Sequence, residues 1–181
     1  MDIYEHLAEM TPFIQKQDWK GLETKYSTLC NALSGGAESK RISAISLTAY
    51  LVSLRKALTK SVSEAHKHKA KAIYFEYDLD NTWDSNFFIC PAYNPEPQGD
   101  EDWACDWVSE VPGPSHQPMS EIYLENHFDK TDKAKGNTLY LVARTVSVLG
   151  QAMEGIGCDG LVVCAAFHDQ DPIMRLNANE A

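Results

Sequence analysis

The sequence predicts an α+β fold, with N-terminal helices followed by a mainly antiparallel sheet that one long helix covers. Three observations support this prediction. Apolar residues repeat at helical spacing up to about residue 70 and then alternate at a period of two from Ala72. A clear helical stripe runs from Leu139 to Met153, and a continuous apolar run follows from Leu161 to Phe167. Helices first and strands afterwards are typical of α+β proteins.

The first seventy residues predict three helices. The first has a stripe made of Ile3, Leu7, Met10 and Ile14. Asp2 is its expected N-cap, and Asp18 is the expected N-cap of a second helix. That second helix should end at Ser34-Gly35-Gly36, because glycine readily takes the conformation that closes a helix. A third helix is expected from about Glu38 to about His66.

The remaining elements follow from the same patterns. The predicted strands are Ile73–Tyr77, Phe87–Cys90, Trp103–Val108, Leu161–Phe167 and a short return at Ile173–Leu176. Asp80-Asn81-Thr82 should form the turn between the first two strands. Ser120 to Phe128 predicts a short helix, and Asn137 is expected to open the long one. The Leu161–Phe167 run indicates a strand buried on both faces.

Length and composition predict one soluble domain over residues 1–181, with a helical part at 1–70 and a sheet-containing part at 71–181. The chain has 181 residues, of which 44% are hydrophobic and 23% are charged. The acidic start has no apolar h-region, and no run of eighteen apolar residues occurs. The five cysteines form no Cys-x-x-Cys pair, as expected for reduced thiols. A cytoplasmic location without membrane contact is expected, and the oligomeric state stays open.

Charge is distributed unevenly along the chain. Ala72 to Asp129 contains no lysine or arginine, yet it holds thirteen of the twenty-six acidic residues and eleven aromatic residues. A solvated acidic tail would avoid aromatic residues, so the segment predicts an ordered, negatively charged surface. Because the net charge is −10, the chain should repel nucleic acids and anionic lipids, and neither is expected as a partner. A basic protein is the expected partner.

The expected docking surface combines carboxylates with tryptophans. Its predicted members are Trp83, Asp84, Asp100, Glu101, Asp102, Trp103, Asp106 and Trp107. Aromatic side chains supply anchoring area, and carboxylates steer a cationic partner. Immunity-type inhibitors of basic toxins work by this principle. The sequence therefore predicts a non-enzymatic acidic binding module of that type, with no catalytic residues, cofactor or metal. The alternative interpretation of the segment, a solvated sheet face with acidic loops, stays open.

One motif supports an alternative function. Asp78-Leu79-Asp80-Asn81-Thr82 resembles the first motif of the haloacid dehalogenase phosphohydrolases, in which an Asp-x-Asp-x-Thr run ends a strand. The resemblance implies Asp78 as nucleophile, Asp80 as general acid and a magnesium ion between them. Lys130 or Lys135 would supply the required lysine. The resemblance covers five residues, and that family continues with a helix where this sequence predicts a returning strand.

Other candidate sites have simpler structural explanations. His168, Asp169 and Asp171 lie on a strand-end turn, where catalytic groups often occur, and Asp169 with Asp171 would complete the alternative active site. A looser calcium site could use Asp78, Asp80 and Asp84, although Trp83 stands where an EF-hand requires glycine. The Gly155–Gly160 run matches Gly-x-Gly-x-x-Gly, but it follows a helix and precedes a strand, so we interpret it as a loop. His66 and His68 are two residues apart, on different helix faces.

Overall fold

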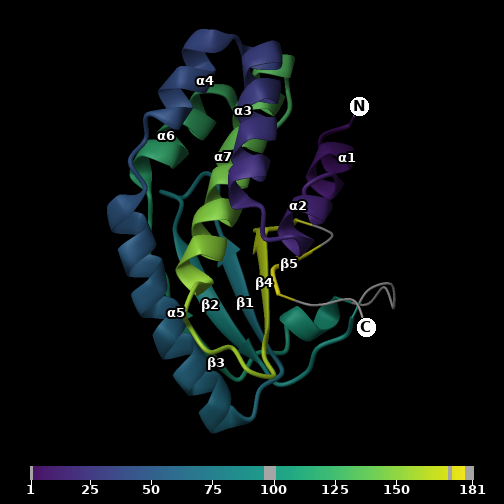
Figure 1. The fold of residues 1–181 in the computed structure, drawn as a ribbon, viewed down its shortest axis with the longest axis vertical. Coiled ribbons are helices and arrows are strands. Elements are labelled where there is room, and N and C mark those ends of the chain that lie inside the picture. Colours follow the sequence, from purple (N-terminus) through teal and green to yellow (C-terminus); the bar gives the residue numbers. More distant parts are fainter. Residues whose placement is uncertain (1, 96–100, 171–172, 178–181) are drawn as a thin grey trace.

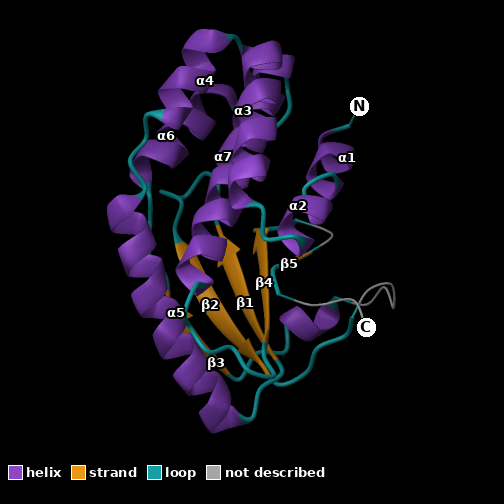
Figure 2. Cartoon of the chain, viewed as in Figure 1, coloured by secondary structure: helices purple, strands orange, loops and turns teal. Residues whose placement is uncertain are grey.

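The computed structural model describes residues 2–95, 101–170 and 173–177. It has the expected α+β architecture, in which helices are packed on a five-stranded sheet (Figures 1 and 2). The helices are α1 (Ile3–Ala8), α2 (Thr11–Gln15), α3 (Trp19–Ser34), α4 (Gly36–Ser43), α5 (Thr48–His68), α6 (Gln117–Asn126), α7 (Asp132–Met153) and the short 3₁₀ helix η1 (Asp102–Ala104). The strands are β1 (Ala72–Tyr77), β2 (Ser85–Cys90), β3 (Ser109–Pro112), β4 (Val162–Phe167) and β5 (Met174–Arg175).

The sheet is mixed and mostly antiparallel. Its strand order is β3-β2-β1-β4-β5, and β1 and β4 form its parallel pair. The hairpin of β1 and β2 confirms the predicted return strand, with Phe75 opposite Phe87. In the parallel pair Tyr77 lies opposite Phe167, so both strands end at the same edge of the sheet. The turns that follow β1 and β4 therefore leave the sheet side by side.

Helices cover one face of this sheet. The long helix α7 is buried along nearly its whole length, with α3 packed on it and α5 packed on β1, β2 and β3 (Figure 1). Gly150 permits the close approach of α3, because a Cβ atom there would lie 2.3 Å from the Trp19 ring. Ile73, Phe75 and Phe87 point into this layer and are completely buried. The main hydrophobic core therefore lies between the sheet and the helices.

The predicted N-caps of the first two helices are present. Asp2 forms a capping box with Glu5, and the Asp18 side chain accepts a hydrogen bond from the Gly21 amide at 2.9 Å. The first apolar stripe is split between α1 and α2 by a turn at residues 9–10, and Pro12 lies in the first turn of α2. Proline is tolerated at that position because the amide would have no helical partner there. All four stripe residues are nevertheless buried.

The single helix expected from Glu38 to His66 is wrong, because α4 ends at Ser43 and α5 begins at Thr48. Arg144 of α7 explains the break. Its guanidinium group donates hydrogen bonds to the carbonyl oxygens of Ile42 and Ile45, which would otherwise be available to a continuing helix. A cation from a distant part of the chain thus binds the carboxyl end of α4.

The strand expected at Trp103–Val108 is also wrong. Residues 102–104 form η1, and the strand that pairs with β2 is β3, at Ser109–Pro112. This register places Val111 opposite Phe87, where the Val111 side chain is buried beneath the helices. A strand paired with β2 through Trp103 and Trp107 would place a tryptophan, not an aliphatic side chain, opposite Phe87. The burial of Val111 gives a physical reason for the later start of β3.

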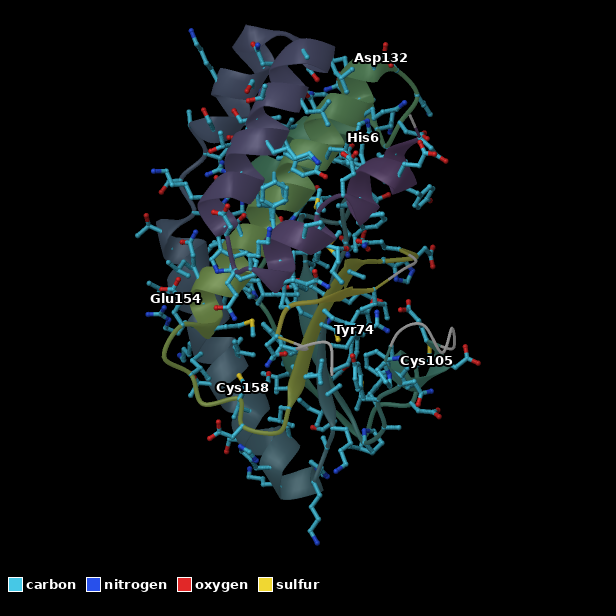
Figure 3. The ribbon with its side chains drawn as sticks, turned by 45° about the vertical axis from the view of Figure 1, so that its right-hand side comes forward. His6, Tyr74, Cys105, Asp132, Glu154 and Cys158 are labelled. Atoms are coloured by element: carbon cyan, nitrogen blue, oxygen red, sulfur yellow. The ribbon has the colours of Figure 1, made fainter. Side chains whose placement is uncertain are left out.

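A second, smaller hydrophobic cluster lies on the opposite face of the sheet. We call this the outer face, and its buried residues are Ala72, Tyr74, Cys90, Trp103, Ala104, Cys164, Ala166 and Ile173. Tyr74 and Cys105 both lie on the side of the sheet away from α5 (Figure 3). The segment containing η1 covers this face at β1, at β4 and at the Cys90 end of β2, while the face around Phe88 and over β3 is more open.

Candidate functional site

The open part of the outer face is built by alternation along three strands. Tyr74 lies opposite Phe88, and Phe88 lies opposite Glu110, so the three side chains share this face. Glu76 lies on it as well, two residues beyond Tyr74. Phe88 is half-buried and Glu110 is exposed, whereas the neighbouring Phe87 points into the core.

Trp107 is the largest side chain on this open area. Its ring packs on the Phe88 ring with centroids 5.2 Å apart, and Phe88 in turn stacks against Tyr74. Trp107 is nevertheless 46% exposed, and Val108 beside it is 49% exposed. Asp106 and Glu110, both exposed, flank this pair in the sequence. The surface is thus a supported aromatic ring with an aliphatic neighbour and carboxylates close by. We call Phe88, Asp106, Trp107, Val108 and Glu110 the Trp107 surface.

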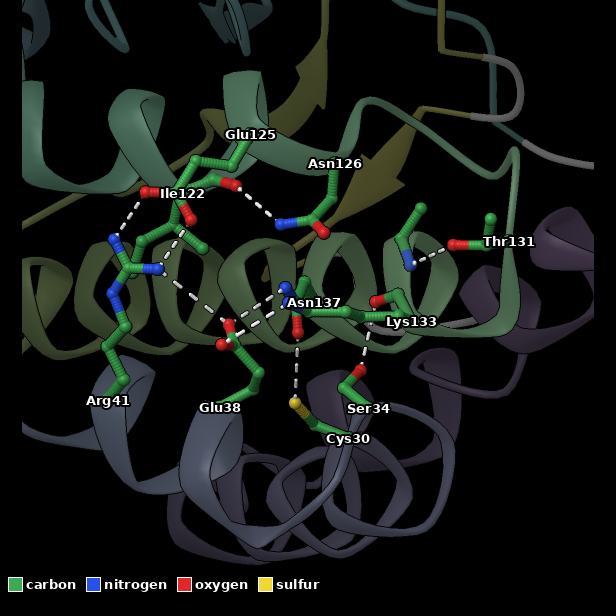
Figure 4. Close-up of polar contacts among 11 residues, drawn as sticks. Cys30, Ser34, Glu38, Arg41, Ile122, Glu125, Asn126, Thr131, Lys133 and Asn137 are labelled. Carbon is green, nitrogen blue, oxygen red and sulfur yellow. Dashed lines mark hydrogen bonds and ion pairs between the residues drawn. The ribbon is translucent and has the colours of Figure 1, made fainter.

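Among the described residues, three acidic side chains of the Ala72–Asp129 segment form ion pairs with groups from outside it. Arg41 of α4 makes a bidentate pair with Glu125 of α6, with both nitrogen–oxygen distances 2.6 Å (Figure 4). Arg175 of β5 pairs with Glu101 at 3.1 Å. The Glu76 carboxylate accepts a hydrogen bond from the His168 ring at 3.2 Å. Arg144 lies instead beside Glu23, and Lys67 pairs with Glu64, so these two cations bind carboxylates outside the segment.

The Trp107 surface keeps its negative charge. Within the described parts of the chain, no lysine or arginine forms an ion pair with Asp106 or Glu110. Both carboxylates are exposed, so they retain their hydration and act through their field rather than through buried contacts. An approaching cation would therefore be attracted to this part of the molecule.

The predicted docking residues separate into different environments. Trp83 is completely buried beneath the helices, where its indole N–H donates to the Thr145 hydroxyl at 3.0 Å. Trp103 is 4% exposed and packs against Tyr93 on the outer face. Neither ring is available to a partner in this structure. Trp107 is the tryptophan of the predicted set that reaches the surface.

The predicted acidic members also differ from one another. Glu101 binds Arg175 and accepts a hydrogen bond from the Ile173 amide at 2.9 Å, so it joins η1 to β5. Asp102 and Asp84 are exposed, and Asp84 lies in the β1–β2 turn. Asp100 lies outside the described residues. Phe88, Val108 and Glu110 were not among the predicted docking residues. Phe87 and Phe88 are consecutive in a strand, so their side chains point to opposite faces, and this alternation could have identified Phe88.

A second candidate site lies where β1 and β4 end. A pocket of about 300 Å³ is lined by Tyr4, Asp78, Leu79, Asp80, Tyr123, Phe128, Phe167, His168 and Asp169. We call it the strand-end pocket. It brings together two turns that are about ninety residues apart in the sequence. The structure thus places Asp169 in the same pocket as Asp78 and Asp80, while Asp171 lies outside the described residues.

The electrostatics of this pocket follow from its crowded carboxyl groups. The Asp80 amide donates to Asp78 at 3.3 Å in the turn after β1. The pKa of the Asp80 carboxyl is raised, first because it shares a hydrogen bond with the Asp78 carboxyl and then because of burial. The pKa of His168 is raised because Glu76 stabilises the imidazolium. Burial, followed by the charges of Asp80 and Asp78, raises the pKa of Tyr123.

The strand-end pocket departs from the haloacid dehalogenase pattern. The turn at residues 78–84 leads directly into β2, where that family has a helix. No lysine is among the described residues that line the pocket, so neither Lys130 nor Lys135 takes the expected place. Within the described chain, no group of three or more His, Cys, Asp or Glu side chains is arranged to hold a metal ion. Asp78, Asp80 and Asp84, suggested as a looser calcium site, therefore do not form such a group.

The glycine-rich run and the histidine pair can now be placed. Residues 155–160 connect α7 to β4, as the order of elements had indicated. His66 and His68 lie in the last turn of α5, where His68 approaches Glu64. Among the described residues, no helix is both long and apolar enough to cross a membrane. Comparisons with protein-family models, with curated proteins and with solved structures found no match.

Proposed function

We propose that this protein is a non-enzymatic module that binds a basic protein through the Trp107 surface. The observation that supports the proposal is the exposed Trp107 ring, which is held on Phe88 between two acidic residues without an arginine or lysine partner among the described residues. Tryptophan is enriched at interfaces because its large ring supplies anchoring area at little conformational cost. Asp106 and Glu110 would accelerate encounter with a cationic partner.

An inhibitor of the immunity type is the form of binder that these features suit best. Such an inhibitor neutralises a basic enzyme by covering part of its surface, and it needs no catalytic group of its own. The acidic net charge of −10 would favour fast association with a basic target. The proposal rests on charge and surface chemistry, and the partner is defined by its basic character.

The partner can be sought by comparative capture from cells that carry the gene. Wild-type protein and the Trp107→Ala variant would serve as baits, with Val52→Ala as the matched control, since Val52 is exposed on α5, away from the Trp107 surface. A basic protein retained by the wild type and Val52→Ala, and lost with Trp107→Ala, is the expected result. Trp107→Ala should reduce the free energy of unfolding by about 1 kcal/mol or less.

Binding kinetics with the captured partner then test the electrostatic part. Replacing Asp106 and Glu110 by Asn and Gln should mainly lower the association rate, whereas Trp107→Ala should mainly raise the dissociation rate. Salt should slow association by wild type, because the Debye length falls from about 10 Å at 0.1 M to about 3 Å at 1 M. Association that ignores salt, or a partner that docks on α3 and α4 instead, would refute the proposal.

A further inference from the structure

The strand-end pocket combines two kinds of wall. Carboxylates from the turns after β1 and β4 form one part, namely Asp78, Asp80 and Asp169. Aromatic rings from three other segments form the rest. Tyr4 comes from α1, Tyr123 from α6 and Phe128 from the connection to α7. Carboxylates beside exposed aromatic faces are the combination that recognises organic cations, through charge and through the negative faces of the rings.

The aromatic wall is a connected set of rings. The Tyr4 ring lies 6.0 Å from that of Phe128, and the Phe128 ring meets the buried Phe167 ring edge-on at 5.5 Å. Tyr123 is held in turn by an edge contact with the buried Trp83, at 6.4 Å. These contacts hold the rings in place without a ligand. The main core therefore supports the wall from behind.

The carboxylates of the pocket lack a strong local cation. Among the described residues that line the pocket, His168 is the basic one, and its ring lies 3.2 Å from Glu76 and 3.7 Å from Asp169. Asp78 and Asp80 belong to the same turn, in which the Asp80 backbone amide donates to the Asp78 carboxylate at 3.3 Å, and two neighbouring carboxylates repel each other when both are charged. A cation placed between them would relieve that repulsion.

The shape of the pocket favours an organic cation over a metal ion. The described acidic side chains do not form a group of three or more ligands placed around one point, as a metal ion requires. A volume of about 300 Å³ suits a small molecule or a single side chain, at the lower end of the usual range for ligand pockets. Aromatic rings would contribute little to a hydrated divalent ion, whereas they contact an alkyl chain and its charged head together.

We propose that the strand-end pocket binds a primary ammonium or guanidinium group, with Asp78 and Asp80 as counterions and Tyr4 and Tyr123 as its aromatic walls. The ligand is a small free amine or the side chain of a lysine or arginine. This inference does not depend on the Trp107 surface, because it involves a different set of residues.

Calorimetric titration with two probes tests the proposal and distinguishes the two sources. Agmatine represents a free amine, and an N-acetyl-arginine N-methylamide represents a protein side chain. Saturable binding of either probe is the expected result, and the tighter of the two identifies the source. The absence of binding by both probes would overturn the proposal. Displacement of a bound probe by Mg²⁺ or Ca²⁺ at equal concentration would also overturn it, because the site would then be a metal site.

Matched variants locate the binding. Asp78→Asn and Asp80→Asn should each raise the Kd about 10-fold or more, since each removes a charge-assisted contact while the amide oxygen can still accept the hydrogen bonds of the turn. Asp159→Asn removes the same charge from an exposed position outside both the pocket and the Trp107 surface, and it should leave the Kd nearly unchanged. An equal loss with Asp159→Asn would show that general electrostatic attraction is responsible, and the proposal would fail.

The aromatic contribution has its own control. Tyr4→Leu should raise the Kd about 2- to 5-fold, whereas Tyr4→Phe should keep most of the affinity because the ring remains. Tyr4 is 44% exposed at the first turn of α1 and is not part of the buried core, so neither change threatens the core. Equal affinities of the Leu and Phe variants would exclude a ring contact with the cation. Far-ultraviolet circular dichroism of each variant confirms that the fold is intact before titration.

Discussion

Phe87 and Phe88 are neighbours in β2, yet they belong to opposite faces of the sheet. Phe87 is completely buried beneath the helices and contacts Phe75 at a centroid distance of 4.7 Å. Phe88 lies half-buried on the outer face, between Tyr74 and the exposed Trp107. The helix-covered face consists almost entirely of closed core, whereas the outer face is closed at β1, β4 and the Cys90 end of β2 but open around Phe88 and over β3. The difference shows that one strand can supply both the core and a surface available for binding.

The largest effect should come from the helix-covered face. Phe87→Ala should lower the free energy of unfolding by about 3–5 kcal/mol, because it leaves a cavity in a closely packed layer. Urea denaturation followed by circular dichroism measures this change. A loss below about 1 kcal/mol would mean that the helices do not pack on this face as described.

A smaller effect is expected where the η1 segment is fastened to the outer face. Arg175→Met should lower the free energy of unfolding by about 2 kcal/mol, because Glu101 loses its cationic partner while the apolar stem is kept. Arg175 is nearly buried and also donates to the Tyr93 hydroxyl at 3.1 Å. In the Arg175→Met variant, the backbone amides of residues 101–104 should also exchange their hydrogens faster. Unchanged exchange there would show that other contacts fasten this segment.

Replacing Phe88, on the open part of the outer face, provides the direct comparison with the Phe87 variant. Phe88→Ala should cost about 1 kcal/mol in the same denaturation experiment, because the ring is half-exposed and its loss opens no closed cavity. Trp107 fluorescence should also shift towards that of a hydrated indole, since its supporting ring is gone. Equal losses of stability for the two phenylalanine variants would remove the distinction between the faces.

The smallest effect concerns the exposed pair of His168 and Glu76. Glu76→Gln should lower the pKa of His168, because the hydrogen bond and charge of Glu76 are the main causes of its rise above the ordinary value of 6.5. The folded pKa is raised, so the stability that this pair adds is fully present below pH 6.5 and is lost as the pH rises through the folded pKa. A proton NMR titration of the His168 ring measures the shift. An unchanged titration would show that Glu76 does not contact the ring in solution.

Local patterns were sufficient for most of the elements. The alternation from Ile73 to Tyr77 and the apolar run to Phe167 each placed a strand correctly, because side-chain parity in a strand follows directly from sequence. The caps at Asp2 and Asp18 were also correct, since capping involves residues only a few positions apart. The α+β class follows from these local signals together.

Distant contacts decided the elements that were wrong. Arg144 lies about a hundred residues from the carbonyl groups it binds at the end of α4, so no local pattern could show the break there. The start of β3 depended on which residue could be buried opposite Phe87, and that residue is Val111. Both outcomes depend on the register and packing of separate elements, which sequence spacing does not specify.

The same division holds for the candidate sites. By itself the sequence determined that the Ala72–Asp129 segment is acidic and aromatic and that Asp78 and Asp80 follow a strand. Only the tertiary structure decided that Trp107 is exposed while Trp83 is buried, because exposure depends on what other segments cover. It also brought Asp169 into the pocket of Asp78 and Asp80, because parallel pairing aligns the ends of β1 and β4. Residue types are local properties, whereas burial and proximity arise when separate elements pack together.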